Sequence, residues 1–115
     1  MKKLYLRGPF ELTEDSIHTE VELALPGVFV LGGSGVFSDR DACVGRSDTN
    51  VALALADYIG RYRYFNFVYC ASAKLAFEDQ CDLYHELRPC DTPLHPARLP
   101  GTSWICPRCG LAEAA

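Results

Sequence analysis

The sequence has no run of about 18 consecutive apolar residues, which a transmembrane helix would need, so no membrane span is expected. Its first residues, Met1 to Tyr5, contain two lysines but lack the long apolar stretch of a signal peptide. Internal repeats and low-complexity tracts are also lacking. The formal net charge of −4 provides no overall electrostatic attraction for nucleic acid. These absences predict a cytoplasmic protein that is not attached to a membrane.

What remains is an ordinary globular composition with an unusual number of cysteines. The chain has 115 residues, of which 49% are hydrophobic and 23% are charged, and this predicts one domain with a single core. Six cysteines could indicate a secreted disulfide scaffold. The missing signal peptide and a Cys-x-x-Cys motif near the C-terminus favour reduced cysteines instead.

Three short segments predict strands. Val28–Leu31 follows the Pro26-Gly27 turn as a buried strand, and a second short run is centred on Ala42–Val44. The two runs are expected to form a hairpin. Tyr62–Cys70 is rich in aromatic residues and valine, with Tyr64, Asn66 and Val68 on one face and Phe65, Phe67 and Tyr69 on the other.

Two helices are predicted from capping residues and apolar spacing. The first follows Ser47 or Asp48 as its N-cap and ends at Gly60. Its broad apolar face is expected to contain Val51, Leu53, Leu55, Ala56 and Ile59. The second follows Ser72 and runs to about Leu87, where Arg88-Pro89 ends it.

This order of elements predicts an α+β fold with a small three-stranded antiparallel sheet and flanking helices. Residues 1–26 are polar and acidic and are interpreted as an N-terminal arm with one short strand near Leu4–Leu6. Residues 27–88 are expected to form the domain. Residues 89–115, which are rich in proline, are expected to form a zinc-binding tail packed on the second helix.

The tail contains the strongest chemical motif, Cys106-Pro107-Arg108-Cys109-Gly110. Two thiolates separated by two residues, with proline and glycine beside them, are typical of a zinc knuckle. A redox Cys-x-x-Cys normally begins a helix after a strand, and no helix is predicted after Cys109. The motif therefore predicts a structural Zn²⁺ ion.

The other two ligands have more than one candidate. Cys81 and His85 are four residues apart on the second predicted helix, so they share one face at about 6 Å. The predicted ligands are Cys81, His85, Cys106 and Cys109. His95, in the proline-rich loop, is an alternative because Cys81 could be a buried helix cysteine; Cys90 is a weaker candidate. Four protein ligands leave no open position for a substrate. Trp104 is expected to pack the tail onto the domain.

The run Pro26–Leu31 followed by Cys43-Val44-Gly45-Arg46-Ser47 resembles the GIY-YIG nuclease domain. In that family two tripeptides lie on neighbouring strands, and a helix, a third strand and a second helix follow. The predicted order of elements matches over roughly Gly27–Leu87. The pattern Tyr84-His85, His95-Pro96 and Trp104-Ile105-Cys106-Pro107-Arg108-Cys109 is also similar to that of small bacterial GIY-YIG-like proteins. This second resemblance implies one zinc that holds the tail against the second helix.

The family resemblance also implies where catalytic residues should lie. GIY-YIG nucleases cut phosphodiesters with two tyrosines, an arginine and a metal-binding glutamate, and these positions fall on Phe29, Cys43, Ala54 and Gln80. Phe29 has no hydroxyl group to hold water, and Gln80 has no charge with which to anchor Mg²⁺. Ala54 leaves the phosphate without a bidentate partner.

The combined prediction is a zinc-stabilised, catalytically inactive GIY-YIG-like binding module for nucleic acid or a protein partner. One alternative is a metal-dependent DNA or RNA endonuclease with a rearranged active site that uses Arg46 and Glu78. Another is an accessory protein that acts through its surface alone.

Overall fold

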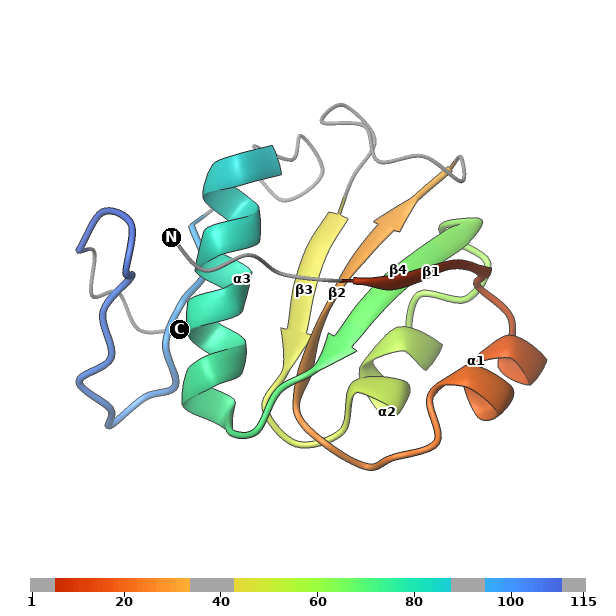
Figure 1. Ribbon diagram of the computed structural model, residues 1–115, viewed down its shortest axis with the longest axis horizontal. Helices are drawn as coiled ribbons and strands as arrows, with labels where there is room; N and C mark the ends of the chain where they lie inside the picture. The colour runs from red at the N-terminus through yellow and green to blue at the C-terminus, as the bar shows by residue number, and fades with distance from the viewer. Residues whose placement is uncertain (1–5, 34–42, 88–94, 111–115) are drawn as a thin grey trace.

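The computed structural model describes residues 6–33, 43–87 and 95–110. Its strands are β1 (Arg7–Glu11), β2 (Gly27–Gly32), β3 (Cys43–Ser47) and β4 (Tyr64–Tyr69), and its helices are α1 (Glu14–Glu20), α2 (Val51–Ala56) and α3 (Ala73–Leu87). The strands form one antiparallel sheet in the order β1-β4-β2-β3 (Figure 1). The predicted α+β class is confirmed, but the sheet has four strands and not three.

The additional strand, β1, lies in the segment that was interpreted as an arm. Arg7 pairs with Phe67 and Phe10 pairs with Phe65, and the register shifts between these two pairs. Gly8 and Pro9 interrupt the alternating pattern in the sequence, and proline is tolerated in a sheet at an edge strand such as this one. Of the strand expected near Leu4–Leu6, Leu4 and Tyr5 lie outside the described residues, and β1 begins directly after Leu6, at Arg7.

Helix α1 is also an unexpected element of the same segment. Thr13 caps it, because its Oγ1 accepts a hydrogen bond of 3.1 Å from the backbone N–H of Ser16. Ile17 is the one buried residue of the helix. Seven residues with a single buried apolar side chain give a weak periodic signal, so this helix depends on packing against the rest of the protein.

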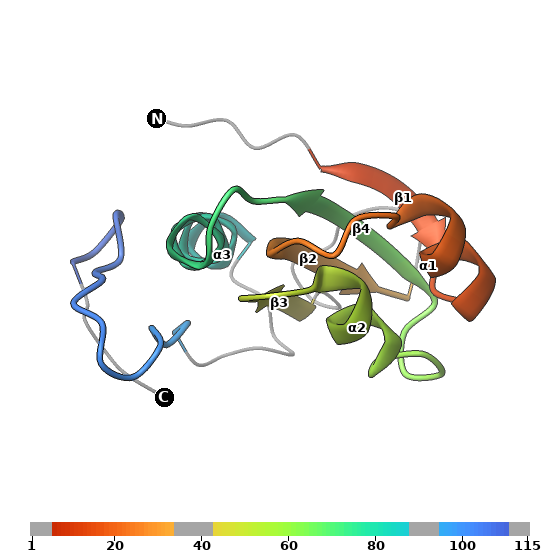
Figure 2. The same ribbon diagram turned by 90° about the horizontal axis from the view of Figure 1, so that it is seen from below.

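The sheet has a core on each face, and β2 contributes to both. Phe29 and Leu31 face α1 and α2, where they pack with Ile17, Val51, Leu55, Phe65 and Phe67. Val28 and Val30 face the other way and pack with Val44, Ala76 and Leu83, the last two of which lie on α3. Figure 2 shows α3 on the side of the sheet opposite to α1 and α2.

The second predicted helix has its expected position as α3, but the first is shorter than predicted, because α2 ends at Ala56 and not at Gly60, so that Ile59 lies outside it. The caps also differ in one case. Ser72 caps α3 as predicted, since its Oγ accepts from the N–H of Leu75 at 3.2 Å. The N-cap of α2 is Asn50, whose Oδ1 accepts from the N–H of Ala52 at 3.1 Å. Ser47 forms the preceding turn instead, because its Oγ accepts from the N–H of Asn50 at 2.8 Å. None of the helices in residues 6–33, 43–87 and 95–110 is long and apolar enough to cross a bilayer.

Candidate metal centre

Residues 95–110 lie along the outer side of α3, away from the sheet (Figures 1 and 2). Trp104 packs on Phe77 of α3 with the ring centroids 5.9 Å apart, beside the buried Cys81 and Cys106. Arg108 adds an ion pair to α3, with its Nε 3.0 Å from Oδ1 of Asp82. The predicted role of Trp104 in packing the tail onto the domain is confirmed.

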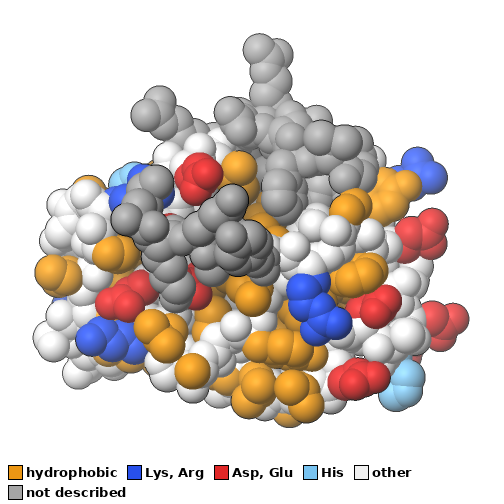
Figure 3. Space-filling view, in the orientation of Figure 1, with side chains coloured by type: hydrophobic (Ala, Val, Ile, Leu, Met, Phe, Trp, Pro, Cys, Tyr) orange, Lys and Arg blue, Asp and Glu red, His pale blue; other side chains and the backbone are white. Residues whose placement is uncertain are grey.

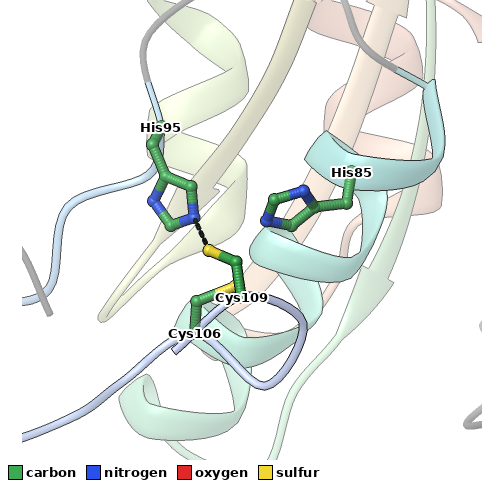
Figure 4. A group of neighbouring side chains, drawn as sticks. All are labelled: His85, His95, Cys106 and Cys109. Carbon is green, nitrogen blue, oxygen red and sulfur yellow. Dashed lines mark hydrogen bonds between the residues drawn. The ribbon is translucent and has the colours of Figure 1, made fainter. Parts of the chain in front are cut away.

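Four potential metal ligands meet where the tail crosses α3. These are His85 from the last turn of α3, His95 from the start of the described tail, and Cys106 and Cys109 from the knuckle, and their ligand atoms all lie within 4.8 Å of one another. Figure 4 shows both imidazole rings directed toward the two sulfur atoms. Two nitrogens and two sulfurs at such distances are close enough to bind one metal ion.

The hydrogen bonds of the histidines leave nitrogen atoms available for a metal. Nδ1 of His95 donates to the carbonyl of Pro96 at 2.8 Å, so its Nε2 carries the free electron pair, and this atom lies 3.4 Å from Sγ of Cys109. Nε2 of His85 is buried and has no hydrogen-bond partner among the described residues. A buried polar atom without a partner is costly, and a metal ion at this position would satisfy it.

The knuckle favours a negatively charged sulfur at Cys106. Burial raises the pKa of this thiol, but the backbone N–H groups of Cys109 and Arg108 and the side chains of His95 and Cys109 outweigh that effect and lower the pKa to about 6. The N–H of Arg108 lies 3.4 Å from Sγ of Cys106. Gly110, with φ of 74°, closes the turn by donating its N–H to the carbonyl of Cys106 at 2.9 Å. The thiolate is the form of cysteine that binds metals.

Cys81 lies next to this group but is not a member of it. The structure brings together the set in which His95 replaces Cys81. Cys81 is fully buried and donates a hydrogen bond to Cys106, and burial, followed by the proximity of Cys106, raises the pKa of its thiol. The other sequence candidate, Cys90, lies outside the described residues.

A hollow separate from the metal ligands is lined by residues of β3, α2 and α3. It has a volume of about 430 Å³, and its lining includes Phe29, Ala54 and Gln80, three of the four positions derived from the family resemblance. The fourth, Cys43, is buried and is not among the described lining residues. Glu78 does not line this hollow either, although Arg46 does.

The Arg46 side chain in this hollow donates three hydrogen bonds. Its Nε donates to Oδ1 of Asp48 at 2.9 Å, its Nη1 to Oε1 of Gln80 at 2.7 Å and its Nη2 to the carbonyl of Ala97 at 2.6 Å. Its guanidinium carbon lies 5.3 Å from the centroid of the Phe77 ring, and the side chain is only 11% exposed. Arg46 therefore joins β3 to α3 and, through the carbonyl of Ala97, to the tail.

Tyr58 and Asp57 also line the hollow, and sequence reasoning did not identify them. The Tyr58 ring packs on Phe29 with the centroids 5.8 Å apart. Burial, followed by the nearby Cys43, raises the pKa of its phenol, so the hydroxyl group stays protonated at neutral pH. The signal was present in the spacing, because the helix predicted to run to Gly60 would place Tyr58 one turn after Ala54.

Comparisons of the chain with models of known families, with curated proteins and with solved structures find no match.

Proposed function

We propose that this protein is a zinc-stabilised, catalytically inactive GIY-YIG-like binding module. The observation that carries the proposal is the state of Arg46, whose guanidinium group is occupied by Asp48, Gln80 and the carbonyl of Ala97. An arginine that stabilises a phosphate needs free N–H groups directed at the ligand. Here these groups maintain the packing of β3 against α3 and the tail.

Zinc is the metal that best fits the donor set of His85, His95, Cys106 and Cys109. Two imidazole nitrogens and two thiolates are a common tetrahedral ligand set for zinc, and hard cations such as Mg²⁺ prefer oxygen ligands. Four protein ligands would leave no position for water, so the ion would act as a structural crosslink between α3 and the tail. One zinc per chain by elemental analysis of the purified protein is the expected result.

The contents of the hollow support a loss of nuclease chemistry. Phe29 and Ala54 place apolar groups there, and the amide of Gln80 is hydrogen-bonded to Arg46. Three of the positions that would hold water, phosphate and metal in the family therefore lack suitable groups in this chain. The remaining role is binding, either of nucleic acid or of a protein partner.

The alternative function, a metal-dependent endonuclease with a rearranged site, predicts a different result in a direct assay. The zinc-loaded protein is incubated with Mg²⁺ or Mn²⁺ and with single-stranded and double-stranded DNA and RNA. No cleavage above a no-protein control is expected. Cleavage that requires the added ion, disappears in Glu78→Ala and persists in the matched surface variant Glu86→Ala would establish the alternative.

A further inference from the structure

Three cysteines meet where the tail crosses α3. Cys106 and Cys109 belong to the knuckle, and their sulfur atoms lie within 4.8 Å of one another as part of the group of metal ligands. Cys81, on α3, donates a hydrogen bond to Cys106 and packs with it in one buried cluster. The sulfur of Cys106 therefore has a second cysteine on each side, one in the knuckle and one on the helix.

Cys81 is a thiol that the group of metal ligands does not need. His85, His95, Cys106 and Cys109 already provide four donors. A buried cysteine often acts as a small apolar residue, and Cys81 does pack in the same cluster as Phe77. Packing alone does not require a sulfur beside a metal-binding sulfur. This contact gives the site a reaction that an alanine at the same position could not provide.

The three sulfurs differ in their access to solvent. Cys109 is exposed, whereas Cys106 is 2% exposed and Cys81 is 0% exposed. The tail forms the left edge of the molecule in Figure 3, and a small oxidant from solvent can reach Cys109 there. Exposure therefore decreases from Cys109 through Cys106 to Cys81, which is also the order in which the sulfurs are neighbours.

We propose that these cysteines form an oxidation site, at which hydrogen peroxide replaces the metal crosslink between α3 and the tail by a disulfide between Cys81 and Cys106. The site is the proposed zinc centre, so the inference rests on the proposed function and adds its regulation. A metal-bound thiolate is open to oxidation when solvent reaches it, and a neighbouring thiol converts the first oxidation product into a disulfide.

The reaction has three steps. The Cys109 thiolate attacks one oxygen of the peroxide, the O–O bond breaks, and a sulfenic acid and hydroxide form. The Cys106 thiolate attacks the sulfur of this sulfenic acid, the S–O bond breaks, and a Cys106–Cys109 disulfide and a second hydroxide form. Cys81 then attacks the sulfur of Cys106, and its proton ends on the departing Cys109. The two hydroxide ions take protons from solvent, so two thiolates lose two electrons and one peroxide becomes two water molecules.

The third step is favoured by contacts that are already present. Trp104 packs on Phe77 of α3, so the Cys81 sulfur lies beside Cys106 when the first disulfide forms. Exchange within such a contact has a high effective concentration. A disulfide sulfur is no longer a thiolate ligand, so Zn²⁺ is released, while the new bond keeps the tail on the helix.

The zinc-loaded full-length protein, treated with a small molar excess of hydrogen peroxide, tests the proposal. One zinc per chain should be released, as measured with a chromogenic zinc indicator, and two free thiols per chain should be lost. Dithiothreitol followed by added zinc should reverse both changes.

The disulfide is located by mass spectrometry of unreduced peptides after digestion with trypsin and a glutamate-specific protease. The cuts expected after Glu86, Arg98 and Arg108 leave each cysteine between α3 and the C-terminus on a peptide of its own. A pair of peptides joined through Cys81 and Cys106 is the expected product.

Cys81→Ala distinguishes this exchange from the oxidation of an ordinary Cys-x-x-Cys motif. The variant should still release its zinc, but its disulfide should join Cys106 to Cys109. After oxidation its Trp104 emission should shift to longer wavelength, whereas the unchanged protein should keep the emission of the folded state. Cys43→Ala is the matched control, because Cys43 is also buried but packs in the core on the other face of the sheet. It should form the same disulfide as the unchanged protein.

A stable Cys106–Cys109 disulfide in the unchanged protein overturns the proposal. It is also overturned by a disulfide to Cys90, by sulfinic acid without a disulfide, or by peroxide treatment that leaves the zinc bound. Failure of the proposed function gives a different result, since a purified protein without zinc before oxidation, or with nuclease activity, contradicts that function alone. The disulfide map then still decides whether the three sulfurs react in the proposed order.

Discussion

Arg46 on β3 donates a hydrogen bond of 2.7 Å from its Nη1 to Oε1 of Gln80 on α3. This contact joins the hollow to the helix that carries His85. Nη2 of the same guanidinium donates to the carbonyl of Ala97 in the tail. The side chain is therefore a junction between the sheet, the helix and the metal-binding segment.

Arg46→Ala should destabilise the protein by about 2 kcal/mol or more, because it leaves Asp48, Gln80 and the carbonyl of Ala97 without their donor. The free energy of unfolding is measured by urea titration followed by circular dichroism. The matched control is Arg63→Ala, an exposed position where a change of about 0.5 kcal/mol or less is expected. Equal effects of the two substitutions would show that the junction does not contribute to stability.

Removal of the metal should release the tail from α3. Trp104 is the single tryptophan of the chain and packs on Phe77, so its fluorescence reports on this contact alone. Addition of a zinc chelator is expected to shift the emission to longer wavelength and to lower the melting temperature, and restored zinc should reverse both changes. An emission spectrum that does not respond to the chelator would contradict a structural role for the ion.

The choice between His95 and Cys81 as a ligand can be made with cobalt in place of zinc. His95→Ala should lose most metal affinity, since it removes one of the four clustered donors. Cys81→Ala should keep one metal per chain, and the thiolate-to-cobalt absorption should stay that of two sulfur ligands. The reverse pattern, with Cys81→Ala losing metal and charge-transfer intensity, would make Cys81 a ligand.

Gly45→Ala should cost about 1–3 kcal/mol, the usual range for overpacking a buried site. A Cβ atom at Gly45 would lie 2.5 Å from Cζ of Phe29, which is only 1% exposed and has little room to move. The penalty should be smaller in a Phe29→Leu background, and a double-mutant cycle measures that difference. Gly33→Ala is the control, because a Cβ there meets no atom of the described residues within 4 Å. Additive effects of Gly45→Ala and Phe29→Leu would rule out the clash.

The sequence was informative where the local pattern and the final environment agree. The alternation from Tyr64 to Tyr69 is reproduced in β4, and the pairing of Phe29 with Gly45 follows the predicted hairpin. In both cases short apolar runs become buried in the sheet, so periodicity alone identifies them. Ser72 was recognisable as a cap because its hydrogen bond is local in sequence.

Elements that depend on distant contacts were not predictable in the same way. β1 is stabilised by pairing with β4, and the bulge near Pro9 hides its alternation. The full set of metal ligands could not be predicted from the sequence for a similar reason. Cys81 and His85 are four residues apart and do lie on the same helix, α3, as predicted from the sequence. The path of the tail, however, decides which side chains meet the two cysteine sulfurs, and it brings His95 to them. Sequence spacing contains no information about that path.

The strand order β1-β4-β2-β3 has a consequence for how the chain folds. Phe29 and Gly45 are close in sequence and can meet early, whereas Arg7 must wait for Phe67. Closing the longer loop costs more chain entropy, so the central strands are expected to assemble first and the N-terminal edge to dock later. During synthesis, β1 and α1 would leave the ribosome well before their partner β4 exists. Because β1 and α1 are polar and acidic, this segment stays hydrated until β4 is present and can pair with β1.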